Sequence, residues 1–164
     1  MMYYTTFHSP AGLLTLYSDG TAIAAITMPV WRYQPNPGSM ESDDLPVFQQ
    51  AKAWLENYFT GSVPQNCPPI SAVGTPFQQQ VWKILQEIPR SSTLTYGDIA
   101  RKLEEATGRR TSPRAVGSAV GRNPVAIMIP CHRVLGAGGS LTGFGGGLDA
   151  KRFLLDLEGI PYHS

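Results

Sequence analysis

Residues 61–74, with the sequence GSVPQNCPPISAVG, separate two parts of the chain that differ in hydrophobic periodicity. The segment holds three prolines and no helical or strand pattern, as is typical of a linker. The part before it is rich in short β-branched and aromatic runs, whereas apolar residues after it recur at helical spacing. We therefore predict an α+β protein with an N-terminal domain over residues 1–74 and a C-terminal domain over residues 75–164.

The N-terminal part predicts a small antiparallel sheet followed by one helix. Runs rich in β-branched and aromatic residues, separated by the turn sequences SPAG and SDG, predict strands at residues 3–8, 12–18 and 21–28. Between residues 45 and 60 the apolar side chains recur every three or four positions, which predicts an amphipathic helix that ends at Gly61.

The C-terminal part predicts a mainly helical domain. The sequence TPFQ places Thr75 as an N-cap, a proline at the first helical position and a glutamine at the capping-box position. The segment LTYGDIARKL and the segment after Ser112 predict two short helices, a pair that indicates a helix-turn-helix, although the connection EEATGRRT is long for that motif. A glycine-rich hairpin or loop follows at residues 135–147, and a last amphipathic helix ends at Gly159.

The composition excludes several classes of protein. With 42% hydrophobic and 15% charged residues, the chain is not expected to be disordered. No run reaches the roughly 18 apolar residues of a membrane span, and the N-terminus lacks the pattern of a signal peptide. Cys67 and Cys131 form no disulfide framework, which favours a cytoplasmic location. The three histidines show no metal-ligand spacing, so we expect no metal and no cofactor.

Charge is distributed unevenly between the two parts. Residues 1–75 carry a net charge of −3, and residues 76–164 carry +4. The C-terminal part is therefore the one expected to meet a polyanion. The alternative is that this asymmetry is incidental, and charge alone does not decide between the two.

Cys131 is the candidate nucleophile. The apolar run VAIMI, residues 125–129, predicts a buried strand, and Pro130 stiffens its exit just before the thiol. A thiol reacts as the thiolate, which a nearby cation favours, and His132 and Arg133 follow directly. Neighbours in an extended segment point to opposite sides, so a water or a turn is needed to join His132 to the sulfur.

Two alternatives for Cys131 stay open on the residues alone. A buried cysteine is more often a small apolar side chain than a nucleophile. A protease-like pair would need a histidine from another element, and His8 and His163 both lie near the ends of the chain, which gives such a pair little support.

The sequence around Cys131 resembles a known signature. IPCHRV is similar to the active-site motif of the O6-alkylguanine-DNA alkyltransferases, and TPFQQQVWKIL, TYGDIA, RAVGSAVGRNP, GSLTGFGGG and KRFLLDLEG resemble further blocks of that family in the same order. Together these blocks cover about residues 75–159. The resemblance implies a ribonuclease-H-like N-terminal domain and a C-terminal domain with a winged-helix or helix-turn-helix DNA-binding motif.

The resemblance implies a DNA repair activity. The alkyl group of O6-alkylguanine, with O4-alkylthymine as a second substrate, would pass irreversibly to Cys131 after the base is flipped out of the duplex. One molecule would repair one lesion. Four residues would form the catalytic group: Cys131 as acceptor, His132 as its base through a water, Glu158 as the partner that orients His132, and Asn123 as a brace of the turn.

A second group of residues would bind the flipped base. Tyr96 would contact the base and rotate the flanking phosphate, Val134 would offer its carbonyl to the guanine amino group, Gly145 would offer its N–H near O6, and Lys151 would bias the electrostatics of the pocket. Phe144 stands where many relatives carry a tyrosine whose hydroxyl donates to O6. Loss of one such donor raises the barrier by about a few kcal/mol.

A third group would contact DNA. Arg114 would enter the base stack, and the small residues of its helix would let the backbone approach the minor groove, unless they serve tight packing in the core. The residues implied in DNA binding are Arg114, Ala115, Gly117, Ser118, Arg122 and Arg133. The segment between Tyr96 and Arg114 is longer than in relatives, and there Arg109 and Arg110 either add phosphate contacts or form a solvated turn.

Two other functions remain as alternatives. A lesion-recognition protein would bind alkylguanine without transfer, and Phe144 keeps that reading open although the cysteine is present. A thiol hydrolase unrelated to DNA would turn over esters or amides, which the basic C-terminal part disfavours. The partner expected here is double-stranded DNA, with no membrane, and the expected state is a monomer.

Overall fold

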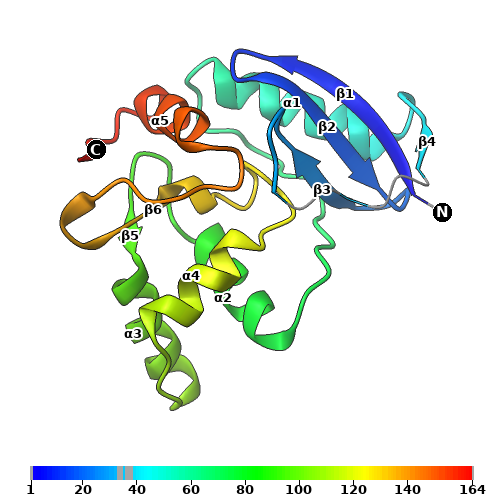
Figure 1. Ribbon diagram of the computed structural model, residues 1–164. Coiled ribbons are helices and arrows are strands. Elements are labelled where there is room, and N and C mark those ends of the chain that lie inside the picture. The colour runs from blue at the N-terminus through cyan, green and yellow to red at the C-terminus, as the bar shows by residue number, and fades with distance from the viewer. Residues whose placement is uncertain (1, 33–34, 36–38, 164) are drawn as a thin grey trace. The chain divides into compact units, whose positions relative to one another are not determined.

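The computed structural model describes residues 2–32, 35 and 39–163, and the chain divides into two compact units (Figure 1). The first unit contains Met1–Val73 together with Pro124–Met128, and the second contains Gly74–Asn123 and Ile129–Ser164. The division near residue 74 falls at the proline-rich segment. Pro124–Met128 depart from the expected boundaries, because they pack with the N-terminal unit although they lie far downstream in the sequence.

The first unit is a sheet covered by a helix. Its strands are β1 (Tyr3–Ser9), β2 (Gly12–Ser18), β3 (Ile23–Thr27) and β4 (Met40–Glu41), in the order β3-β2-β1-β4. Neighbours β1, β2 and β3 are antiparallel as predicted, while β4 pairs in parallel with β1. The helix α1 (Pro46–Phe59) packs against β1, β2 and β3 and closes the core of this unit.

The register of this sheet follows from a tight turn and from the buried side chains. Ser9 pairs with Gly12, and the ladder continues without a slip to Tyr3 and Ser18. Gly12 has a φ of +106°, and a Cβ there would lie 2.7 Å from the ring of Pro29, so glycine is required at this position. The fully buried core side chains of the unit include Leu14, Leu16, Ile23, Ile26, Phe48, Leu55 and Tyr58.

The prediction of a buried strand at residues 125–129 is wrong. Val125 makes one bridge to Ile26, and the chain then turns, with Ile127 at a φ of +71°. The bridge is closed by hydrogen bonds of 3.0 Å from Ile26 N to Pro124 O and from Ala126 N to Ile26 O. The residues are buried as expected, but an apolar run does not distinguish a buried turn from a buried strand.

The second unit is mainly helical. It contains α2 (Pro76–Gln86), α3 (Tyr96–Thr107), α4 (Pro113–Gly121) and α5 (Leu148–Leu157). Both α2 and α3 pack against α4 (Figure 1). The indole N–H of Trp82 donates to the carbonyl of Ala119 at 2.9 Å. No helix in the described part of the chain is long and apolar enough to cross a bilayer.

Short elements connect these helices around the candidate site. The strand β5 (Leu94–Thr95) pairs in parallel with β6 (Val134–Leu135), and the 3-10 turns are η1 (Cys131–Arg133) and η2 (Ala137–Gly139). The expected glycine-rich hairpin or loop begins at the end of β6 and contains η2, which is enclosed by an antiparallel bridge between Gly136 and Ser140. Because β6 follows η1 directly, the pairing with β5 anchors the segment that carries Cys131.

The connection between α3 and α4 is shorter than the sequence predicts. α3 continues to Thr107, so that half of the segment EEATGRRT is helical. Gly108 ends the helix in the left-handed conformation, with a φ of 74°, and Ser112 caps α4 by accepting from Ala115 N. The segment is therefore divided between the last turn of α3 and a short connection from Gly108 to Ser112.

The capping box of α2 supplies a test of how local signals stabilise this unit. Thr75 Oγ1 accepts from Gln78 N at 3.1 Å, and Gln78 Oε1 accepts from Thr75 N at 2.9 Å. Thr75→Ala is expected to lower the free energy of unfolding by about 1 kcal/mol in urea titrations, because a helix N–H loses its partner. Thr93→Ala removes the same atoms at an exposed position and should change stability by less than about 0.5 kcal/mol. Equal effects of the two substitutions would contradict the role of the cap.

Candidate active site

Cys131 lies at the start of a tight turn rather than in an extended segment. Its N–H donates to Ile129 O at 2.7 Å, and Arg133 N donates to Pro130 O at 3.0 Å, which closes the turn η1. The turn η1 holds Cys131 and His132 in one local structure. The thiol side chain is 4% exposed, and burial raises the pKa of Cys131 to about 11.

Asn123 braces this turn from the end of α4. Its side-chain amide donates to Ile129 O at 2.8 Å, and the side chain is buried. A hydrogen bond from the Asn123 side chain to Cys131 stabilises the thiolate and, with the positive charge of Lys151, partly opposes the effect of burial on the pKa of Cys131. The amide therefore contacts both the backbone that positions the thiol and the thiol itself.

His132 is paired with Glu158 in the interior. Its Nε2 lies 2.6 Å from Glu158 Oε2, and both side chains are fully buried. Burial lowers the pKa of His132 below 6.5, although the hydrogen bond to Glu158 acts in the opposite direction. The ring is therefore neutral at neutral pH. Because a carboxylate only accepts, Nε2 carries the proton, and the buried Nδ1 has the lone pair that a base needs.

Glu158 is held by more groups than the sequence indicates. Ser91 N donates to Oε1 at 3.0 Å, and the Ser91 hydroxyl donates to the Glu158 carbonyl at 2.7 Å. Arg133 contacts both carboxylate oxygens, with Nε at 2.8 Å from Oε1 and one terminal nitrogen at 3.2 Å from Oε2. The carboxylate that orients His132 is thus fixed from three sides.

The expectation that Arg133 contacts DNA is wrong. The side chain is buried, it forms the ion pair with Glu158, and its remaining terminal nitrogen donates to Ile88 O at 2.7 Å. A guanidinium held in this way is a structural partner of the site. The position of Arg133 close to Cys131 in the sequence does not indicate this ion pair, because the partner Glu158 lies at the C-terminal end of α5.

Lys151, Val134, Thr142 and Tyr96 form a connected polar group beside Cys131. Lys151 Nζ donates to Val134 O at 2.7 Å and to Thr142 Oγ1 at 3.5 Å, and Thr142 Oγ1 lies 2.8 Å from the Tyr96 hydroxyl. Lys151 is buried, which lowers its pKa to about 8, and Cys131 opposes this shift. Burial also raises the pKa of Tyr96. Thr142 was missed by sequence reasoning, because nothing local marks a threonine that links two other elements.

Phe144 and Gly145 lie in the loop between Thr142 and α5. Phe144 is buried at 9% exposure, and Gly145 is partly exposed. Phe144 O accepts from Gly147 N at 2.9 Å, which turns the chain into α5. The phenyl ring at this position supplies no hydroxyl donor to the group around Lys151.

The helix α4 has an exposed face of small and basic residues. Val116, Ala119 and Val120 are buried, so packing explains the small size of Ala119. A Cβ on Gly117 would lie 3.6 Å from the ring of Tyr96, an ordinary contact distance. The residues of α4 and its C-cap that were predicted to contact DNA and that are exposed are Arg114, Ala115, Ser118 and Arg122.

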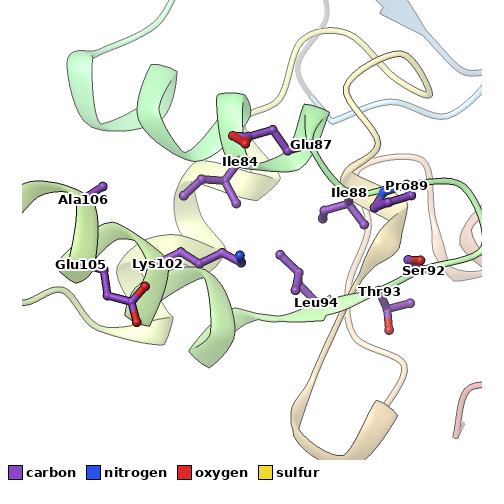
Figure 2. Close-up of a pocket in the computed structure, with 10 residues that line it drawn as sticks. All are labelled: Ile84, Glu87, Ile88, Pro89, Ser92, Thr93, Leu94, Lys102, Glu105 and Ala106. Carbon is purple, nitrogen blue, oxygen red and sulfur yellow. The ribbon is translucent and has the colours of Figure 1, made fainter.

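A separate hollow of about 520 Å³ lies between α2, α3 and β5 (Figure 2). Its lining includes Ile84 and Leu94 with Lys102, Glu87 and Glu105, and none of the predicted site residues. No group of three or more His, Cys, Asp or Glu side chains within the described residues is arranged to hold a metal ion.

Comparison with known proteins gives the family. Residues 76–160 match the family model described as 6-O-methylguanine DNA methyltransferase, DNA binding domain, and residues 2–66 match that of its ribonuclease-like domain. A methylated-DNA–protein-cysteine methyltransferase of Haemophilus influenzae is 48% identical over 98% of this chain and 88% of its own length. Its counterpart in Mycobacterium tuberculosis is 42% identical over 96% of this chain and 93% of its own.

A solved structure agrees with these sequence matches. The crystal structure of Mycobacterium tuberculosis OGT in complex with DNA superposes with a TM-score of 0.86 at 42% identity, covering 96% of this chain and 93% of that one. The sequence-based expectation of an α+β fold with a ribonuclease-like N-terminal domain and a DNA-binding C-terminal domain is confirmed. Since both domain models and relatives along almost the whole length match, the chain belongs to the 6-O-methylguanine DNA methyltransferase family.

Proposed function

We propose that this chain repairs DNA by moving the alkyl group of O6-alkylguanine, and secondarily of O4-alkylthymine, to the sulfur of its own Cys131. The observation that carries the proposal is the buried thiol on a turn braced by Asn123, next to a neutral His132 held by Glu158. The names of the relatives, which describe transfer from methylated DNA to a protein cysteine, support it.

The proton of the thiol is the first obstacle to the reaction. With a pKa of about 11, Cys131 is a neutral thiol at neutral pH, and the thiolate is the nucleophile. Nδ1 of the neutral His132 takes this proton through a bridging water, while Glu158 stabilises the imidazolium that forms. The buried positive charge of Lys151 favours the thiolate at the same moment.

Alkyl transfer then follows as an in-line displacement. The sulfur attacks the alkyl carbon, the carbon–oxygen bond breaks, and its electron pair stays on guanine O6. Hydrogen-bond donors at the site, with the Gly145 N–H as the candidate nearest O6, neutralise the developing charge. The product is a thioether, which no group of the site reverses, so each molecule acts once.

The base must leave the duplex to reach a buried sulfur. We infer that α4 docks in the minor groove through its exposed face and that Arg114 fills the space of the flipped nucleotide. The Val134 carbonyl accepts from Lys151, and its second lone pair remains for the guanine amino group. The protein acts as a monomer in the cytoplasm, where its two free cysteines stay reduced.

Mass spectrometry of the intact protein tests the proposal. Incubation with a duplex that carries O6-methylguanine is expected to add one methyl group, located by peptide mapping on Cys131 and not on the exposed Cys67. The same duplex without the lesion is the control. Tight binding to lesion DNA with an unmodified Cys131 would instead establish a recognition protein that does not transfer.

Phe144→Tyr tests whether O6 lacks a donor in this chain. The added hydroxyl is expected to raise the single-turnover transfer rate by about a hundredfold, since one preorganised donor to the leaving oxygen lowers the barrier by about a few kcal/mol. Phe59→Tyr adds the same group to α1 in the first unit and should leave the rate at the wild-type value. A rate unchanged by Phe144→Tyr would mean that another donor, such as the Gly145 N–H, already serves O6.

A further inference from the structure

The second unit contains a basic hollow of about 630 Å³ at the turn between α3 and α4. We use the term basic hollow for the cavity lined by Phe77 and Gln80 of α2, Thr107 of α3, and Arg109, Arg110 and Thr111 of the connection. None of these residues belongs to the alkyl-acceptor group around Cys131. The hollow therefore needs an explanation of its own.

The charges that line the basic hollow are of one sign. Arg109 and Arg110 are its charged lining residues, and in the described part of the chain neither guanidinium forms an ion pair. The hollow of Figure 2 is different, because Lys102 there is accompanied by Glu87 and Glu105. A cavity with two guanidiniums and no lining carboxylate selects an anion.

The backbone of the connection holds these two arginines in place. Gly108 N donates to Glu104 O at 2.8 Å, which ends α3, and Arg109 N donates to Thr107 Oγ1 at 3.2 Å. The Thr107 hydroxyl in turn donates to Leu103 O at 2.8 Å. The end of α3 at Gly108 therefore places Arg109 and Arg110 together at one end of the pair formed by α3 and α4.

The chemistry of the lining matches a phosphate group. A guanidinium presents a planar fork of donors that binds phosphate oxygens in pairs. Gln80 and Thr111 add neutral donors beside it. Thr111 directly precedes the N-cap Ser112 of α4, and the exposed face of that helix carries Arg114 two residues further on. A phosphate of the DNA backbone is the anion expected beside this face.

We propose that the basic hollow binds a phosphodiester of duplex DNA and supplies a backbone contact outside the alkyl-transfer site. The proposal rests on the proposed function in that DNA is the ligand of this unit. The contact is independent of sequence and of the lesion, because it involves the phosphate alone. It adds affinity for undamaged DNA and increases the dependence of binding on salt.

The test measures binding of an undamaged duplex at several salt concentrations for the variant Arg109→Gln/Arg110→Gln. The slope of log K against log salt is expected to fall in magnitude by about 1, the value for one lost phosphate contact, and affinity at low salt to fall about tenfold. Lys102→Gln is the matched control, since it removes a positive charge from the same helix α3 at the hollow of Figure 2. It should keep the wild-type slope, and thermal unfolding of both variants checks their fold.

Three outcomes would overturn the proposal. A wild-type slope for the double variant would remove the contact, and an equal loss for Lys102→Gln would reduce it to the net charge of the unit. Saturable binding of inorganic phosphate that needs Arg109 and Arg110, together with an unchanged DNA slope, would assign the hollow to a free phosphate compound.

Failure of the wild-type protein to gain a methyl group, with the slope still dependent on the two arginines, would overturn the proposed function and leave the phosphate site standing.

Discussion

Glu158→Gln is expected to lower the free energy of unfolding by about 3–5 kcal/mol, because it removes one partner of a buried ion pair. Arg133 forms that pair with distances of 2.8 and 3.2 Å to the carboxylate oxygens, and its side chain is only 10% exposed. Glutamine keeps nearly the same volume and an acceptor oxygen, but it leaves the guanidinium charge in the interior without compensation. The loss in the free energy of unfolding therefore measures the effect of the uncompensated charge and not of altered packing.

Urea denaturation at neutral pH measures this effect. The control is Asp149→Asn, which removes a carboxylate from the exposed pair of Asp149 with Arg152 and should cost no more than about 1 kcal/mol. If the variant Glu158→Gln unfolds at the same urea concentration as the wild type, Glu158 does not compensate a buried charge. Should the variant prove too unstable to purify, the double variant Glu158→Gln/Arg133→Met removes both charges and is expected to recover part of the stability.

His132→Gln is expected to slow alkyl transfer by about 10²–10⁴-fold, the usual contribution of a general base. In the wild type the imidazole is neutral above its lowered pKa, so the rate should be nearly constant between about pH 6.5 and 8. Without the base, the reaction depends on the small thiolate fraction of a group with a pKa of about 11. The rate of the variant should therefore rise roughly thirtyfold over the same interval.

The upper limit of this interval has a physical reason. Lys151 has a pKa of about 8, so above that pH it loses the positive charge that stabilises the thiolate. Deprotonation of Lys151 and deprotonation of Cys131 would then both change the rate. Single-turnover rates with a methylated duplex at several pH values give the profile. His163→Gln removes an imidazole near the end of the chain and should keep both the rate and the flat profile. A flat profile for His132→Gln would show that the thiol proton does not leave through this ring.

The starts of α2 and α4 could be predicted because their capping signals are local. Thr75 and Ser112 accept hydrogen bonds from N–H groups three residues further along the chain, and the structure contains both bonds. The strands of the first unit follow in the same way from β-branched and aromatic runs bounded by turn residues. The segment at 125–129 could not be predicted, since a buried turn and a buried strand show the same apolar run.

The features of the candidate site also separate into those that depend on local sequence and those that depend on tertiary contacts. The sequence by itself determined the helices, the strands of the first unit and the motif that marks Cys131, because each depends on neighbours within a few positions. Only the tertiary structure decided that Arg133 is buried against Glu158, that Ser91 holds the same carboxylate, and that Thr142 joins Tyr96 to Lys151. These contacts join residues of different elements, and the burial that shifts the pKa of Cys131, His132 and Lys151 arises only when those elements pack together.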